Sequence, residues 1–137
     1  AFAVTAAMAQ DTVTIEVGSH EKHGAHLTDA EGRALYLFEA DTQGKGGETP
    51  ASTCYDDCAA AWPPVIVGAE PKAGDKVKTG LLGRVKRKDG QQQVTYNGWP
   101  LYYFVKDESP GDVKGQDIEG FGAEWYLLTP DGEKVHD

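Results

Sequence analysis

A ten-residue stretch that begins at Gly32 recurs at Gly98, sixty-six positions later in the chain. Five residue types occupy the same positions in both copies: Gly32, Leu35, Tyr36, Phe38 and Asp41 in the first, and Gly98, Leu101, Tyr102, Phe104 and Asp107 in the second. Identities at such fixed spacing indicate an internal duplication. In each copy Tyr and Phe lie two residues apart, which places both rings on one face of a β-strand. We therefore expect each copy to form the second strand of a hairpin, after a glycine turn and before an acidic loop.

The rest of the chain also favours β-structure. Residues 12–17 alternate apolar and polar side chains, and the dipeptides Asp89-Gly90 and Asn97-Gly98 are strong signals for hairpin turns. A plausible helix covers 55–62 and ends before Pro63-Pro64. The sequence thus predicts a mainly β protein, in which antiparallel hairpins form a compact sheet or barrel with an internal pseudo-twofold duplication and one short helix. At 137 residues we expect a single β-rich domain over 10–137, with repeats at about 24–67 and about 91–135.

The pattern Tyr-x-[Phe/Trp/Tyr]-x-x-Asp, present twice, resembles the signature of a bacterial secreted-repeat family described as predicted lipoproteins with a Yx(FWY)xxD motif. The segments 54–64, 94–98 and 110–116 resemble the same family, so the resemblance covers about residues 24 to 135. It implies a secreted protein made of two copies of one repeat. It implies no particular chemistry, because the family has no established activity.

The N-terminal residues 1–9 are small and apolar, and Ala7-Met8-Ala9 before Gln10 has the A-x-A form of a signal-peptide cleavage site. We interpret 1–9 as the remnant of a signal peptide, with a short apolar strand as the alternative. The stretch is too short to span a bilayer, so we expect no membrane insertion and a location in the periplasm or outside the cell. The formal charge of −9 disfavours nucleic acid and anionic membranes as partners, because both bind basic patches.

The two cysteines, Cys54 and Cys58, lie four residues apart. In an oxidising compartment such a pair most often forms a disulfide, here around a very short loop. Two thiolates with an imidazole would instead suit Cu(I) or Zn(II). A catalytic thiol pair is a third alternative, although the Cys-x-x-Cys spacing of thiol oxidoreductases is absent from the sequence.

Three histidines, His20, His23 and His26, lie three residues apart and could hold Zn(II) or Cu(II) if this segment is a loop. Exposed polar side chains in a flexible lead-in are the alternative. A glycine-rich loop with several carboxylates follows the second motif and could hold Ca(II), although its order does not match an EF-hand: Glu108, Asp112, Asp117 and Glu119. Hydrogen bonds from these carboxylates to the backbone are the alternative. We predict no cofactor, with Cu or Zn as the alternative and Ca less favoured.

Most of the aromatic residues are expected in the core. Trp99 at a turn and Tyr103 on the outward strand face form a candidate binding surface. The sequence contains no serine-hydrolase elbow, phosphate loop or metalloprotease motif. We therefore favour a non-enzymatic binding or interaction module for an unknown protein or small ligand. A periplasmic copper- or zinc-binding protein that uses the Cys pair and the His cluster is the first alternative, and an undescribed hydrolase is the second.

Overall fold

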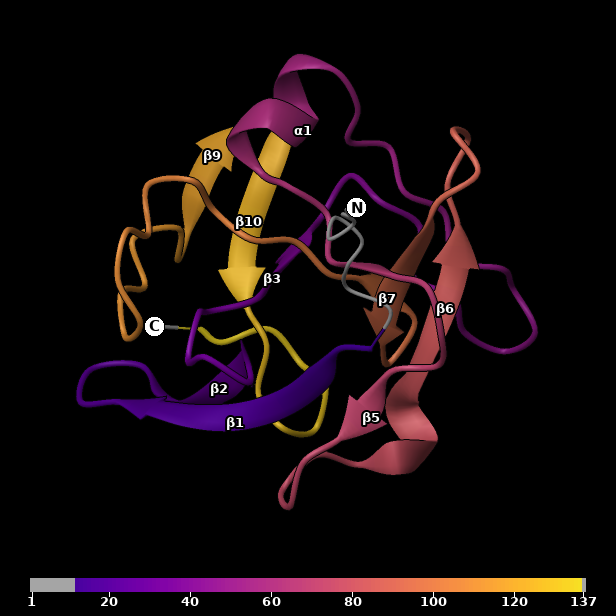
Figure 1. The fold of residues 1–137 in the computed structure, drawn as a ribbon. Helices are drawn as coiled ribbons and strands as arrows, with labels where there is room; N and C mark the ends of the chain where they lie inside the picture. The colour runs from indigo at the N-terminus through magenta and orange to yellow at the C-terminus, as the bar shows by residue number, and fades with distance from the viewer. Residues whose placement is uncertain (1–11, 137) are drawn as a thin grey trace, which may run out of the picture.

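The computed structural model describes residues 12–136, so the predicted signal-peptide remnant at 1–9 lies outside the described residues. Small sheets surround a common centre (Figure 1). The first sheet has the order β2-β1-β5, with β1 at Thr14–His20, β2 at Gly24–Asp29 and β5 at Lys72–Ala73. The second has the order β3-β10-β9, with β3 at Tyr36–Phe38, β9 at Ile118–Gly120 and β10 at Ala123–Leu127. The third has the order β4-β7-β6 with β8 beside β7, and its strands are β4 at Ile66–Val67, β6 at Leu82–Lys86, β7 at Gln92–Tyr96 and β8 at Trp99–Pro100.

The prediction of a mainly β fold is confirmed. The paired strands are antiparallel apart from β1 and β5, and the sheets of the described residues stay separate rather than closing into a barrel. The short helix α1, Asp57–Ala61, falls inside the predicted 55–62, and a 3-10 helix covers Thr79–Leu81. No helix among the described residues is long and apolar enough to cross a membrane.

The two motif copies meet at the centre of the molecule. The amide of Tyr36 donates to the carbonyl of Tyr102 at 2.9 Å, and the amide of Tyr102 donates back to the carbonyl of Tyr36 at 3.0 Å. Such a reciprocal pair between equivalent residues defines a pseudo-twofold axis. The next contacts outward obey the same axis, because Glu39 N donates to Glu124 O at 3.0 Å, and its equivalent Val105 N donates to Ala61 O at 3.0 Å.

A stack of four aromatic rings lies along the same centre. Phe38 stacks on Trp125 with ring centroids 3.9 Å apart, Trp125 on Trp62 at 3.9 Å, and Trp62 on Phe104 at 4.0 Å. Each motif tyrosine meets one tryptophan edge-on, Tyr36 with Trp62 at 5.5 Å and Tyr102 with Trp125 at 5.2 Å. Offset stacks and edge-to-face pairs are the favoured ring geometries. The duplicated rings therefore build one shared core rather than two separate ones.

An aliphatic core lies beside this ring stack. Its buried members come from both repeats and from β1, and include Ile15, Leu27, Leu35, Leu37, Val65, Val94, Leu101 and Leu128. Each side chain of this size contributes about 1.5–3 kcal/mol of transfer free energy when it is fully buried. The two repeats thus share one aliphatic core.

One hairpin differs from the sequence-based expectation. The glycine-rich acidic loop expected after the second motif ends in a hairpin, in which β9 and β10 pair through a tight turn with Ala123 opposite Gly120. Phe121 and Gly122 form that turn with φ angles of 58° and 97°. A non-glycine residue with positive φ is uncommon, so Phe121 gives no turn signal in the sequence.

Candidate functional site

Each motif tyrosine bonds to the aspartate of the other motif copy. The Tyr36 hydroxyl donates to Asp107 Oδ2 at 2.6 Å, and the Tyr102 hydroxyl donates to Asp41 Oδ2 at 2.8 Å. The other carboxylate oxygen of Asp41 accepts from the amide and hydroxyl of Thr53, both at 2.8 Å. Both aspartates are only 6% exposed. The Tyr-x-Phe-x-x-Asp spacing thus fixes the two repeats to one another, and we name these two contacts the cross-repeat pairs.

The electrostatics of the cross-repeat pairs follow from burial. Loss of solvation raises the pKa of Asp41 and of Asp107 above the usual range for a carboxyl, and the hydrogen bonds that each accepts oppose that shift. Burial and the adjacent carboxylates raise the pKa of Tyr36 and of Tyr102 as well. The tyrosines therefore act as hydrogen-bond donors throughout the physiological pH range.

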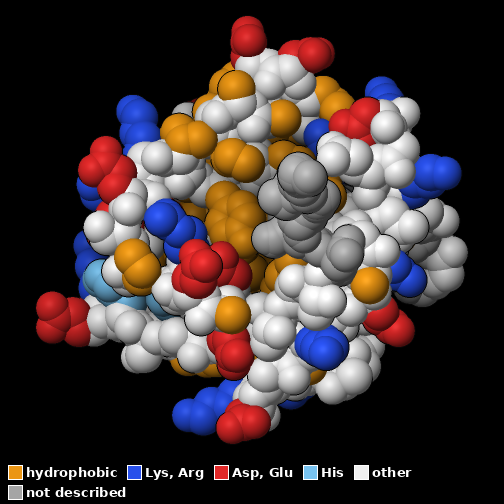
Figure 2. Space-filling model, in the orientation of Figure 1, with side chains coloured by type: hydrophobic (Ala, Val, Ile, Leu, Met, Phe, Trp, Pro, Cys, Tyr) orange, Lys and Arg blue, Asp and Glu red, His pale blue; other side chains and the backbone are white. Residues whose placement is uncertain are grey.

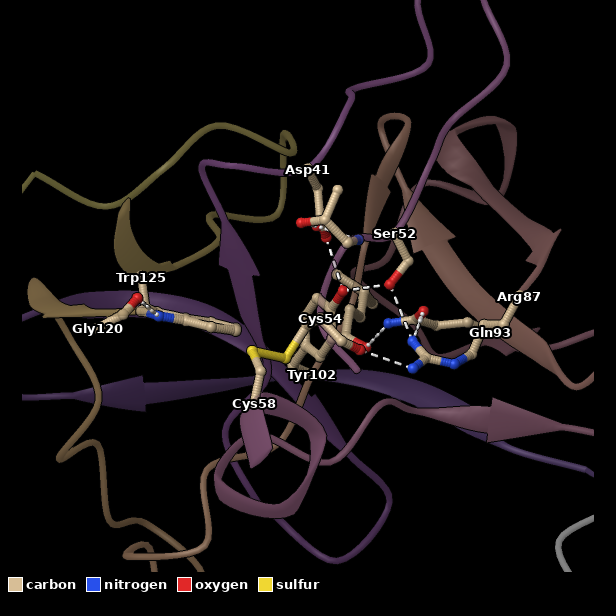
Figure 3. The surroundings of a disulfide bond; sticks show 11 residues. Asp41, Ser52, Cys54, Cys58, Arg87, Gln93, Tyr102, Gly120 and Trp125 are labelled. Carbon is tan, nitrogen blue, oxygen red and sulfur yellow. Dashed lines mark hydrogen bonds between the residues drawn. A yellow bond between two sulfur atoms is a disulfide. The ribbon is translucent and has the colours of Figure 1, made fainter. Parts of the chain in front are cut away.

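A buried arginine lies beside the disulfide between Cys54 and Cys58 (Figure 3). Arg87 donates from Nη1 to Ser52 Oγ at 2.9 Å and from Nη2 to the Cys54 carbonyl at 2.7 Å. Ser52 Oγ in turn lies 2.5 Å from the Tyr102 hydroxyl, so this network continues into a cross-repeat pair. Its geometry is that of a structural clamp on the loop before α1. Ser52 bonds to an arginine and a tyrosine, not to a histidine base.

Two of the three predicted histidine ligands lie together, but the three do not form one metal site. The His20 and His23 rings stack with centroids 5.0 Å apart, whereas His26 is buried and its Nδ1 lies 3.3 Å from the Leu27 carbonyl. Burial lowers the pKa of His26. Across residues 12–136, no group of three or more His, Cys, Asp or Glu side chains is arranged to hold a metal ion.

Two carboxylates of the second acidic loop, Asp107 and Asp112, bond to the backbone. Asp112 Oδ2 accepts from the amides of Glu108 and Ser109 at 3.0 and 3.1 Å, and Asp107 Oδ1 accepts from the amide of Lys114 at 2.8 Å. Such bonds between carboxylates and backbone amides are what the alternative to a calcium site predicts for this loop. The loop therefore owes its conformation to side-chain-to-backbone bonds.

The predicted surface residues Trp99 and Tyr103 are half-buried and pack against the aliphatic core. The Tyr103 hydroxyl donates to Asp29 Oδ2 at 2.9 Å. Large hydrophobic side chains with greater exposure lie elsewhere, at Val105 (50%), Ile118 (38%) and Phe121 (52%). Tyr103 and Val105 both border one hollow in the protein surface, and Trp99 lies outside it.

This hollow is a pocket of about 530 Å³ between the turn of the first hairpin and the end of the second motif. Figure 2 shows hydrophobic side chains gathered in a hollow on this face, with acidic and basic side chains beside it. We name it the Phe104 pocket. Its walls are formed by Thr12, Val13, Thr14, Asp29, Ala30, Glu31, Arg33, Ala34, Pro63, Tyr103, Phe104, Val105 and Asp107.

The rim of the Phe104 pocket is held by hydrogen bonds. Asp29 Oδ1 accepts from the amides of Glu31 at 2.9 Å and Arg33 at 3.0 Å, which closes the turn before the first motif. Arg33 Nη1 donates to the Asp107 carbonyl at 3.0 Å. Burial and the nearby Asp29 carboxylate raise the pKa of Tyr103, so its hydroxyl stays a donor to Asp29. The rim is thus a fixed structure that joins the two repeats.

The pseudo-twofold axis does not repeat this pocket. The corresponding turn of the second repeat is covered, because the Tyr96 hydroxyl donates to the Pro130 carbonyl at 2.5 Å and Asn97 N donates to the Leu81 carbonyl at 2.8 Å. Phe38, the equivalent of Phe104, is 2% exposed. Sequence reasoning missed the pocket because its walls come from both repeats. The one available signal was that Ala30 and Ala34 are small.

The family of the chain follows from the repeats. A family model described as "Secreted repeat of unknown function" matches residues 19–66 and matches again at 83–129. Each matched segment contains one copy of the motif, and together they cover more than half of the chain. Comparisons with curated proteins and with solved structures gave no match. The chain therefore belongs to this family of secreted repeats of unknown function.

Proposed function

We propose that this secreted-repeat protein is a non-enzymatic binding module, and that the Phe104 pocket holds a small organic ligand with a planar, apolar body. We place its action in the periplasm or outside the cell. The family description as secreted supports that location, as does the disulfide between Cys54 and Cys58, which suits an oxidising compartment.

The position of Phe104 is the observation that carries this proposal. Its ring ends the four-ring stack and is half-buried at the pocket, whereas the opposite end of the stack, Phe38, is buried. A planar ligand in the pocket would contact Phe104, Pro63 and Tyr103. Aromatic rings gain contact area and favourable stacking from such an arrangement.

The size and rigidity of the pocket agree with a small-molecule site. Its volume of about 530 Å³ falls inside the range of roughly 300–1,000 Å³ that is common for ligand pockets. A probe of about ten non-hydrogen atoms, at roughly 0.3–0.5 kcal/mol per atom, would bind with a Kd near a millimolar. A natural ligand that fills the pocket would bind more tightly.

Titration of the 15N-labelled protein with indole, followed by two-dimensional NMR, tests the proposal. We expect saturable shifts at Ala34, Phe104 and Val105. Phe104→Leu keeps an apolar side chain but removes the flat ring, so it should weaken indole binding severalfold. Phe121→Leu makes the same change at an exposed hairpin tip outside the pocket and should bind like the parent. Shifts that do not saturate, or that centre on Phe121, would refute the proposal.

A further inference from the structure

We propose that the ligand of the Phe104 pocket is an organic cation, with an ammonium group at the Asp29–Glu31 side of the rim and a planar body on Phe104. This inference rests on the proposed function and adds the charge class of the ligand. It is carried by the charged groups of the rim and by the rings beside them.

The charges that line the pocket are mainly acidic. Asp29, Glu31 and Asp107 border it, and Arg33 is the one cationic side chain among its described lining residues. The Arg33 guanidinium donates to the carbonyl of Asp107, which places it at the second-motif side of the pocket. The Asp107 carboxylate is bonded to the Tyr36 hydroxyl and the Lys114 amide, so the Asp29 and Glu31 carboxylates are the acidic groups that an anionic ligand would have to approach, in a chain whose formal charge is −9.

The Asp29 carboxylate is fixed at the rim before any ligand arrives. One of its oxygens accepts two backbone amides and the other accepts the Tyr103 hydroxyl at 2.9 Å. A carboxylate held by three donors stays in place, so a cation placed near it needs no rearrangement of the site. Glu31, two residues later, is exposed and can turn toward the same position.

Aromatic rings lie beside these carboxylates. Tyr103 and Phe104 both border the pocket, and Tyr103 is bonded to Asp29 itself. Ring faces attract cations, and an ammonium group near both a ring and a carboxylate gains from each. The combination of acidic rim and aromatic floor favours cations with an apolar body over neutral or anionic molecules of the same shape.

A matched set of probes tests the charge class: 2-phenylethylamine, which is cationic at neutral pH, 2-phenylethanol, which is neutral, and 3-phenylpropionate, which is anionic. The full chain is titrated with each by NMR at low and high salt. We expect the amine to bind about fivefold more tightly than the alcohol at low salt, with the difference shrinking as salt screens the charges. The propionate should bind most weakly.

Variants assign the effect to the rim. Glu31→Gln should reduce the preference for the amine about threefold and leave alcohol binding unchanged, whereas Glu48→Gln removes an exposed charge outside the pocket and should change neither. Val105→Lys places a cation at the pocket and should weaken amine binding. Phe121→Lys adds the same charge at a side chain of similar exposure outside the pocket, and it should not weaken amine binding.

The outcomes separate the two proposals. Equal binding of amine and alcohol, or tighter binding of the propionate, would overturn the cation inference and leave the binding module standing. Failure of indole to bind at the pocket would overturn the binding module and the cation inference with it.

Discussion

The cross-repeat pairs predict a sizeable loss of stability from the removal of one oxygen atom. In Tyr102→Phe the ring keeps its edge-on contact with Trp125 at 5.2 Å, while the hydroxyl that donates to Asp41 at 2.8 Å is lost. The contact of that hydroxyl with Ser52 is lost as well, but Ser52 Oγ keeps its bond from Arg87. A hydrogen bond to a buried charged group contributes about 1.5–3 kcal/mol. Asp41 keeps its two bonds from Thr53, so we expect a loss in the lower half of that range, about 2 kcal/mol.

Urea denaturation measures this loss. With a slope of roughly 1–3 kcal/mol per molar, 2 kcal/mol moves the midpoint down by about 1 M without a change in slope. Tyr36→Phe removes the equivalent bond to Asp107 and also the bond from the Gly115 amide to the Tyr36 hydroxyl, so it should lose at least as much. Tyr55→Phe is the control, because the Tyr55 hydroxyl accepts one exposed amide, from Lys88, and should cost less than about 1 kcal/mol. If Tyr102→Phe unfolds at the same urea concentration as the parent, the cross-repeat pairs do not hold the repeats together.

Three further predictions concern the disulfide, the motif glycine and pH. Replacing both Cys54 and Cys58 by Ala should cost about 2 kcal/mol because the closed loop is short, and should leave the β-rich circular-dichroism spectrum intact; complete unfolding would contradict this. In thermal unfolding, Gly98→Ala should destabilise the protein far more than Gly90→Ala. A Cβ at Gly98 would lie 2.0 Å from a backbone oxygen of the facing loop. At Gly90, which has a similar positive φ, a Cβ would meet no atom within 4 Å. Burial raises the folded-state pKa of Asp41 above its unfolded-state pKa, so protonation of Asp41 stabilises the folded state. This contribution to the free energy of unfolding is fully present below the unfolded-state pKa. It is lost as pH rises through the folded-state pKa. The stability of the parent relative to Asp41→Asn should therefore fall over that interval, and a relative stability that rises there would show that the sign is wrong.

The sequence was sufficient to predict the β class and the strand of the first motif copy, β3 at Tyr36–Phe38. The second copy forms only the short β8 at Trp99–Pro100 and isolated bridges at Tyr102. In each motif copy the tyrosine lies two residues before the phenylalanine, and this local spacing is what predicts a strand. The bonds of the two tyrosines to Asp107 and Asp41 could not be predicted, because nothing local states that each tyrosine pairs with the other copy. Each of these carboxylates accepts one nearby backbone amide, as is common in turns, and also a tyrosine hydroxyl from the other copy.

Other features depended on long-range packing in the same way. Arg87 is 4% exposed, although arginine is rarely buried, because the Cys54 carbonyl, Ser52 and Gln93 supply its acceptors. The Phe104 pocket likewise arises where the two repeats meet. The turn of the second repeat is covered by other parts of the chain, whereas the equivalent turn of the first repeat borders the pocket. The duplicated sequence predicts equivalent segments, but the loops that break the symmetry decide which of two equivalent sites is open.

The most direct test of the pocket account is a set of intermolecular NOEs between 2-phenylethylamine and the protein. We predict contacts from the ligand ring to the ring protons of Phe104 and Tyr103, and from the methylene beside the ammonium group to Glu31. Contacts to the exposed Ile118 and Phe121 side chains of the β9–β10 hairpin, with none to Phe104, would contradict it.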